Sequence, residues 1–241
     1  MDLITTATSS DEATRNASIA VLPVGSFEQH GAHLPLLTDT IVASAIAKAV
    51  AEEHRLFLLP PITISCSHEH AAWAGTVSIS AATLIAVITD IAASLEQAGI
   101  HKLALVNGHG GNYVLSNIAQ QANINGPRMT LFPTGTDWRT ARDAAGLHST
   151  GHQDMHAGEL EVSLLLHAAP ETLRPGYEHT DHEANHRPHL LVGGMTRYTA
   201  TGVIGFPSHG TAEKGKAILE SLADSFTEHR DALVRPDDRP K

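Results

Sequence analysis

Hydrophobic and polar positions follow two different rhythms along the chain. Short, nearly continuous apolar runs, typical of strands buried on both faces of a sheet, occupy residues 19–25, 56–64, 102–107 and 129–132. Longer segments with apolar residues at helical spacing occupy residues 38–54, 80–98, 113–123 and 157–167. This alternation of strand and helix predicts an α/β fold, with a mostly parallel sheet covered by helices on both faces.

The stretches between these elements suggest how the chain is divided. Ser80 is placed to cap one helix and Gly99 to end it, because glycine readily adopts the left-handed conformation. We find no repeat and no linker, so residues 1–241 are expected to form a single domain. Segment 176–201 is polar, rich in histidine and without period, which predicts a surface loop. It could be a lid, an ordered crossover or a subunit contact.

Composition narrows the class of protein. Apolar residues make up 42% of the 241, as in soluble globular proteins. The net charge of −10, without any Lys/Arg cluster, argues against nucleic acid and anionic membranes as partners. Cys66 is the single cysteine, which excludes an intrachain disulfide and favours a reducing compartment. The sequence has no signal-peptide pattern, and its longest apolar stretch is too short to span a bilayer, so we expect a cytoplasmic enzyme.

Ionisable side chains gather where the first and third strands end. Glu28 and His30 follow the first strand, Asp39 begins the next helix, and His109 follows the third strand within NGHGGN, residues 107–112. Ligands of open α/β sheets bind beyond the carboxyl ends of the strands. Two carboxylates and two imidazoles there predict a divalent-metal site for zinc, iron or manganese, and an aspartate can bridge two such ions.

These residues also carry a family resemblance. The segments GSFEQHGAHLPLLTDT, NGHGGN, HAGELE and GFP with AEKG resemble, in order and spacing, the signatures of the creatininase family. The resemblance implies a three-layer αβα sandwich and a homo-oligomer, commonly a hexamer. It also implies two divalent ions, Zn²⁺ with Mn²⁺ or Fe²⁺ as alternatives, and hydrolysis of a non-peptide carbon–nitrogen bond in a small-molecule amide.

The resemblance assigns roles to individual positions. Asp39 would bridge the two metals, His109 would bind one of them, and Glu28 and His30 would each extend one coordination sphere. Other residues would contact the substrate or act on it: Ser67 and Gly110 would bind the substrate, and His156 would lie beside the reacting amide.

One position departs from the family pattern. In creatininases proper, a carboxylate ligand lies two residues after the histidine of the second signature, but this chain has Gly111 there. Glu161, which closes the third signature, is expected to supply the missing carboxylate, in preference to Glu159. Branches without the second-signature carboxylate include formamide hydrolases and a mycofactocin-type peptidase that trims a precursor peptide. The expected substrate is therefore not creatinine itself.

The expected reaction is attack of a metal-bridging hydroxide on an amide carbonyl, because bound metal lowers the pKa of water toward neutrality. His156 would protonate the leaving nitrogen or, as an equal alternative, orient a metal ligand. We expect first a small-molecule substrate (a cyclic amide, lactam or formamide). A peptidase that releases a short fragment is the alternative, and a non-catalytic metal-binding subunit is a third hypothesis.

Two further histidine-containing stretches require an interpretation. Residues 182–186 read HEANH, the zincin pattern, but that motif needs a helix and prolines lie close to both of its ends. We interpret these as loop histidines. Residues 67–70, SHEH, could hold a metal, although a place in the pocket wall beside Trp73 is the favoured interpretation.

Overall fold

Four parallel strands form one sheet in the computed structural model, which describes residues 4–234. The strands are β1 (Ile19–Val24), β2 (Phe57–Leu58), β3 (Lys102–Asn107) and β4 (Met129–Phe132), in the spatial order β2-β1-β3-β4. Every pairing between them is parallel, and β1 pairs with β3 along its whole length. The predicted parallel sheet is therefore confirmed, with the two most buried strands at its centre.

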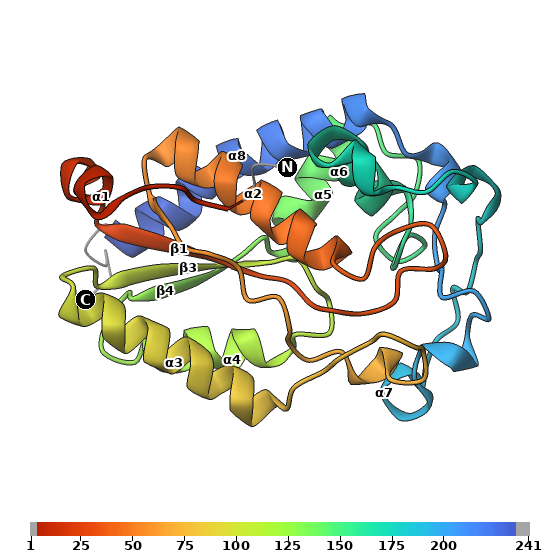
Figure 1. Ribbon diagram of the computed structural model, residues 1–241, viewed down its shortest axis with the longest axis horizontal. Coiled ribbons are helices and arrows are strands. Elements are labelled where there is room, and N and C mark those ends of the chain that lie inside the picture. Colours follow the sequence, from red (N-terminus) through yellow and green to blue (C-terminus); the bar gives the residue numbers. More distant parts are fainter. Residues whose placement is uncertain (1–3, 235–241) are drawn as a thin grey trace, which may run out of the picture.

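Helices cover both faces of this sheet (Figure 1). One face carries α2 (Thr38–His54), α5 (Gly135–Ala144), α6 (Glu159–Ala168) and α8 (Ala212–Val234), and the other carries α3 (Ala81–Gln97) and α4 (Val114–Ala122). Alternate residues of β1 enter the two separate cores: Ile19 and Val21 face α2 and α8, whereas Ala20 and Leu22 face α3 and α4. The three-layer αβα sandwich is thus confirmed.

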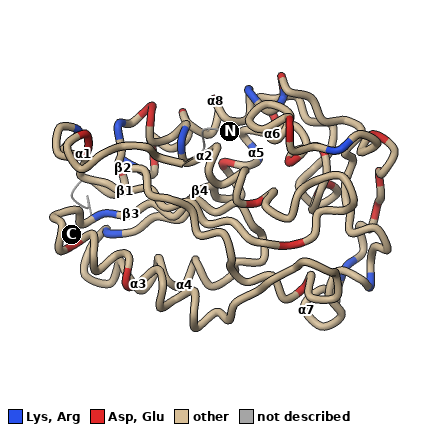
Figure 2. Tube along the Cα trace, viewed as in Figure 1, with Lys and Arg blue, Asp and Glu red and all other residues tan. Residues whose placement is uncertain are grey.

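The remaining elements are short. They are α1 (Ser9–Arg15), α7 (Leu190–Gly193) and the 3₁₀ turns η1 (His68–His70), η2 (Pro170–Thr172), η3 (Tyr177–His179), η4 (Met195–Arg197) and η5 (Pro207–His209). Basic residues are scattered along the trace instead of gathering in one patch (Figure 2). Within residues 4–234, no helix is both long and apolar enough to cross a membrane.

Some predicted elements differ from the observed ones. The predicted strand 56–64 shrinks to Phe57–Leu58, because Pro60 and Pro61 have no N–H to donate to a ladder. Beyond Leu58, the chain still bonds the sheet at Leu59, whose N–H donates to Val21, and at Ile62, which bridges to Val24. The helix expected from residue 157 begins at Glu159.

Four helices, α1, α5, α7 and α8, are absent from the predicted elements. The sequence signals of α5 and α8 are nevertheless present. Thr134 and Asp137 form a capping box at the start of α5. In α8, Ile218, Leu222 and Phe226 recur at helical spacing and are buried. These helices complete the layer that includes α2 and α6.

Segment 176–201 is ordered, which agrees with the ordered crossover among the three alternatives given for it. It contains η3, α7 and η4, and Met195 within it is fully buried. His182 pairs with Gly205 through backbone hydrogen bonds in both directions. The segment therefore packs onto the rest of the chain as a fixed crossover.

Two glycines let α2 approach the strand ends closely. A Cβ atom on Gly25 would lie 2.4 Å from Thr40 Cα, and one on Gly108 would lie 2.4 Å from the backbone oxygen of Asp39. Both obstacles are backbone atoms of the first turn of α2, so a side chain at either glycine would push the helix away. The ends of β1 and β3 can therefore hold Asp39 between them.

This packing predicts that Gly108→Ala lowers the free energy of unfolding by about 1–3 kcal/mol, as overpacking of a close contact does. Urea denaturation followed by circular dichroism would measure the change. Gly110→Ala is the matched control, since a Cβ there meets nothing within 4 Å. A Gly108→Ala protein as stable as the Gly110→Ala protein would contradict this account of the contact.

Candidate metal centre

The four residues predicted to bind metal converge beyond the carboxyl ends of β1 and β3. His30 Nε2 lies 3.1 Å from Asp39 Oδ1, and His109 Nδ1 lies 3.0 Å from Asp39 Oδ2. His109 Nε2 lies 3.2 Å from Glu28 Oε2. All four side chains are at most 5% exposed. Asp39 thus lies between the two imidazoles, in the first turn of α2.

Polar neighbours fix the loop that carries His109. Asn107 accepts a hydrogen bond from the backbone N–H of His109 (3.2 Å) and donates one to its carbonyl (2.8 Å). Asn112 donates to the Asn107 side chain (3.1 Å) and accepts from the backbone of Cys66 (3.2 Å). The two asparagines of NGHGGN therefore position His109. The hydroxyl of Ser26 donates to Asp39 (2.7 Å), so this serine supports the aspartate.

Potential ligand atoms cluster in three sets of three, each with its atoms within 4.8 Å of one another. The sets are Glu28–Asp39–His109, His30–Asp39–Glu161 and Glu28–His30–His156. The first two sets share Asp39, the arrangement in which one aspartate bridges two ions. The structure thus brings Glu161 to the four strand-end residues, on the His30 side of Asp39, with 3.8 Å between Glu161 Oε1 and His30 Nε2.

The carboxylate of Glu28 tests whether these residues suit a metal. Both of its oxygens are buried, and neither accepts a hydrogen bond within the described residues. Each oxygen faces one imidazole nitrogen at 3.2 Å, that of His70 or of His109, and a cation between Glu28, Asp39 and His109 would stabilise the buried charge further. Carboxylate and imidazole donors suit zinc, manganese or iron. The residues present therefore fit a pair of divalent ions.

The three carboxyl groups of the centre, those of Glu28, Asp39 and Glu161, differ in charge. Burial, strengthened by the neighbouring charge of Asp39, raises the pKa of Glu28 to about 8. Burial also raises the pKa of Glu161 to about 7. Burial acts in the same direction on Asp39, but the charges and hydrogen bonds of His30 and His109 hold its pKa well below the usual value. Asp39 is therefore the permanently ionised member of the group.

The two histidines beside Asp39 respond in the opposite way. Burial by itself lowers the pKa of His30, but the charge and hydrogen bond of Asp39 raise it to about 9. Burial likewise lowers the pKa of His109, and Glu28 and Asp39 together raise it to about 10. In the metal-free protein both rings carry protons at neutral pH, and a bound cation would displace them.

His70 and His156, in contrast, are neutral. Burial, reinforced by the charge of His30, lowers the pKa of His70 to about 3 and that of His156 well below its usual value. The side-chain amide of Gln29 donates to His70 Nδ1 (2.9 Å), so the proton of His70 is on Nε2, which lies 3.2 Å from Glu28 Oε1. His156 Nε2 donates to the carbonyl of Gln29 (2.7 Å), so its unprotonated Nδ1 faces Glu28 at 3.8 Å.

Sequence reasoning did not assign His70 and Gln29 to the centre. The sequence signal for His70 is the SHEH stretch, residues 67–70. Its last two residues, Glu69 and His70, contact His109 and Glu28 respectively. Gln29 lies between Glu28 and His30 in the sequence, but its side-chain amide donates to His70 and to the carbonyl of Gly202 (3.2 Å). It fixes two histidines without contacting the predicted ligands.

Other predicted residues fall in three different settings. Ser67 is fully buried, and its hydroxyl has no hydrogen-bond partner within residues 4–234. Gly110 lines a cavity next to His109. Glu159 points away from the centre and accepts hydrogen bonds from Ser149 Oγ (2.6 Å) and Lys214 Nζ (2.7 Å). Glu159 is therefore a structural residue, and Glu161 is the one that faces the metal-binding groups.

The HEANH stretch does not form the helix that a zincin site requires. Residues 183–187 have no regular secondary structure, and His182 Nε2 donates to the carbonyl of Tyr198 (2.9 Å). Neither of its histidines occurs in a metal-capable set within the described residues. These are loop histidines, as interpreted from the sequence.

The central position of Asp39 predicts that Asp39→Asn removes both ions, because the amide keeps the shape of the side chain but not the charge shared by the two sets. Metal content per chain, measured by mass spectrometry after loading with zinc and desalting, should fall to background. Glu183→Gln changes an exposed carboxylate of the HEANH stretch and should leave the metal content unchanged. An Asp39→Asn protein that retains two ions would refute the assignment.

The raised pKa values predict that metal binding strengthens as pH rises. Glu161, Glu28, His30 and His109 hold protons below pKa values of about 7, about 8, about 9 and about 10, and each proton competes with the ion. Affinity for zinc should therefore increase across this range, with protons released on binding. Calorimetry in buffers of different ionisation enthalpy would measure the release, after subtraction of a titration without protein. An affinity independent of pH would contradict the charge assignment.

Comparisons with known proteins agree with this geometry. The sequence profile of the creatininase family, described as creatinine amidohydrolase, matches residues 4–229. The chain is 36% identical over 233 residues to the mycofactocin precursor peptide peptidase of Mycobacterium ulcerans (strain Agy99), which covers 91% of this chain and 86% of that protein. It is 26% identical over 239 residues to the creatinine amidohydrolase of Pseudomonas putida, covering 87% and 89%.

Solved structures share the fold. A creatininase described with manganese aligns with a TM-score of 0.79 at 23% identity, covering 96% of this chain and 98% of that one. A creatininase variant of a Zn-Zn type aligns with a TM-score of 0.80 at 23% identity, covering 98% and 100%. The profile match over residues 4–229 and the similarity to the mycobacterial peptidase show that this chain belongs to the creatininase family of hydrolases, which act on carbon–nitrogen bonds.

Proposed function

We propose that this chain is a metal-dependent peptidase that releases a short fragment from a small precursor peptide. The observation that carries the proposal is a cavity of about 770 Å³ that extends from the metal centre, where His109 and Glu161 line it, to α5 and the loop after it. The 36% identity with a peptidase that acts on the mycofactocin precursor peptide supports the same conclusion.

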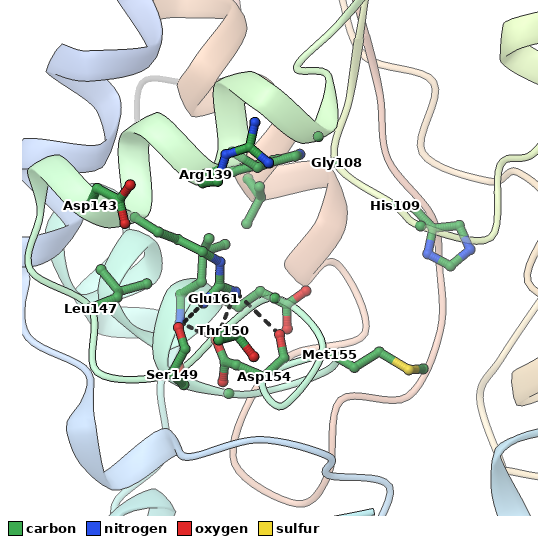
Figure 3. A pocket seen from close by; sticks show the side chains of 18 of the residues that line it. Gly108, His109, Arg139, Asp143, Leu147, Ser149, Thr150, Asp154, Met155 and Glu161 are labelled. Carbon is green, nitrogen blue, oxygen red and sulfur yellow. Dashed lines mark hydrogen bonds and ion pairs between the residues drawn. The ribbon is translucent and has the colours of Figure 1, made fainter. Parts of the chain in front are cut away.

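The walls of this cavity offer both apolar and charged contacts. Trp138 and Leu147 supply apolar surface, and Arg139 and Asp143 supply charged groups. Leu147, Arg139 and Asp143 can be followed in Figure 3. Pockets of about 300–1,000 Å³ accommodate drug-sized ligands, so a creatinine-sized ring would leave most of this space empty. Arg139 hydrogen-bonds Thr136 and forms no ion pair within residues 4–234. Its guanidinium is therefore available to a carboxylate of a peptide.

The residues around the centre divide the chemical work. We infer that Glu28, His30, Asp39, His109 and Glu161 hold two divalent ions, zinc or else manganese or iron. When bound, such ions supply Lewis acidity for a carbonyl oxygen and lower the pKa of water.

Protein groups would perform the remaining tasks. His156, neutral and with an unprotonated Nδ1 directed at the centre, can accept a proton there and pass it to a leaving nitrogen. The unpartnered hydroxyl of Ser67 can hydrogen-bond the substrate. The alternative role of His156, orientation of Glu28, would use the same atom.

Hydrolysis of a small-molecule amide, the first expectation from the sequence, becomes the second candidate. The 26% identity with the creatinine amidohydrolase of Pseudomonas putida favours it. The size of the cavity and the higher identity with the peptidase reverse the order of preference. No observation favours a non-catalytic subunit, because the four strand-end ligands and Glu161 are all in place.

The proposal extends to assembly and location. We propose a homo-oligomer, a hexamer by family resemblance, in the cytoplasm, with neither nucleic acid nor membrane as a partner. The exposed apolar side chains of Leu191 (80% exposed) and Val192 (85%) in α7 support contact with another copy.

A substrate screen tests the proposal. Zinc- or manganese-loaded protein would be incubated with short synthetic peptides, with free or amidated carboxyl ends, and with creatinine, lactams and aryl formamides. Mass spectrometry should detect chelator-sensitive release of a fragment from a peptide, more efficiently when its carboxyl end is free. The Asp39→Asn protein is the control. Addition of water to a small amide, with every peptide left intact, would decide for the second candidate.

A further inference from the structure

The glycine at position 111 leaves a space next to His109, and another residue of the chain fills it. A Cβ atom on Gly111 would lie 2.0 Å from Glu69 Oε1 and 2.9 Å from Glu69 Cδ. It would also lie 2.4 Å from His109 Nε2. The carboxylate nearest to Gly111 is therefore that of Glu69. Glu161, which was expected to replace a side chain at this position, lies on the His30 side of Asp39 instead.

Glu69 faces the imidazole of His109. Its Oε1 lies 3.5 Å from His109 Nε2, the nitrogen that is also 3.2 Å from Glu28 Oε2. The side chain is only 16% exposed. Within residues 4–234 it accepts no hydrogen bond and pairs with no lysine or arginine. Two carboxylates thus flank one ring nitrogen, an arrangement that a cation stabilises and that mutual repulsion otherwise opposes.

The turn that carries Glu69 is fixed on both sides. His70, the next residue of η1, reaches Glu28 and is held by Gln29. On the outer side, Gly194 packs against the backbone of Glu69: a Cβ there would lie 2.9 Å from the Glu69 carbonyl oxygen. Segment 176–201 therefore covers η1, which leaves the Glu69 side chain free to turn while its backbone stays in place.

We propose that Glu69 supplies a carboxylate oxygen to the metal position formed by Glu28, Asp39 and His109, and that position 111 is glycine because the Glu69 carboxylate occupies its space. The fully buried oxygens of Glu28, which accept no hydrogen bond within residues 4–234, independently indicate an ion at this position. The inference rests on the metal centre alone and is the same for a peptide or a small-amide substrate.

Zinc affinity, measured without substrate by competition with a chromophoric chelator, tests this role. Glu69→Gln keeps the size of the side chain and removes its charge, so affinity for one of the two ions should fall at least about 10- to 100-fold, the loss typical of a supporting residue. Gly111→Ala should also weaken binding of that ion, because the new methyl group displaces the Glu69 carboxylate and crowds His109. Glu183→Gln, the same change at an exposed carboxylate of the HEANH stretch, should bind both ions as the wild type does.

Thermal unfolding of the metal-free proteins separates binding from folding. Metal-free Glu69→Gln should still unfold cooperatively, with a melting temperature only slightly below that of the wild type, since it loses a single 3.5 Å pair with His109. Wild-type zinc affinity in Glu69→Gln would overturn the proposal. Peptide cleavage does not enter this test, so failure of the peptidase assignment and failure of the Glu69 assignment would be recognised separately.

Discussion

The rest of the site depends on the buried, ionised carboxylate of Asp39. It lies between His30 and His109, whose contacts at 3.0–3.1 Å keep it charged in an environment that otherwise disfavours charge. Each of its oxygens faces one imidazole. A further carboxylate lies beside each imidazole, Glu28 beside His109 and Glu161 beside His30. The aspartate is therefore the member common to two metal-capable sets of side chains.

The fold brings these groups together through close backbone contacts. Gly25 and Gly108 allow the first turn of α2 to meet the ends of two adjacent strands, which no larger residue would permit. On the opposite side, Asp154 accepts hydrogen bonds from the backbone of Glu159 (2.6 Å) and Leu160 (3.0 Å) and so fixes the start of α6. Glu161, in the first turn of that helix, is thereby directed at His30. Function in this chain thus rests on the precision with which two helix starts meet two strand ends.

Much of this arrangement could be predicted from the sequence, because buried parallel strands read as continuous apolar runs and their ends mark where ligands gather. Glu28, His30, Asp39 and His109 were found in this way. Glu69 and His70 were harder to place, since η1 lies in an irregular stretch whose path no periodicity reveals. Whether Glu69 or Glu161 lies beside Gly111 is a question of distance in space, and sequence order does not answer it.

The preference between substrates depended on elements that the sequence analysis missed. The large cavity is built from α5 and the loop that follows it, including Trp138 and Leu147, and α5 was absent from the predicted helices. A capping box marks its start, but the helix is too short and too polar for a clear hydrophobic period. The metal-capable residues were therefore readable from the strand ends, whereas the cavity that supports the proposal of a peptide substrate became apparent only with the structure.

Anomalous diffraction from crystals of the zinc-loaded protein would test the central claim most directly. The account predicts two zinc peaks about 3.5–4 Å apart, the spacing of two-metal hydrolase sites, with Asp39 between them. One peak should lie against Glu28 and His109, and the other against His30 and Glu161. A single peak, or peaks that Asp39 does not bridge, would contradict the account.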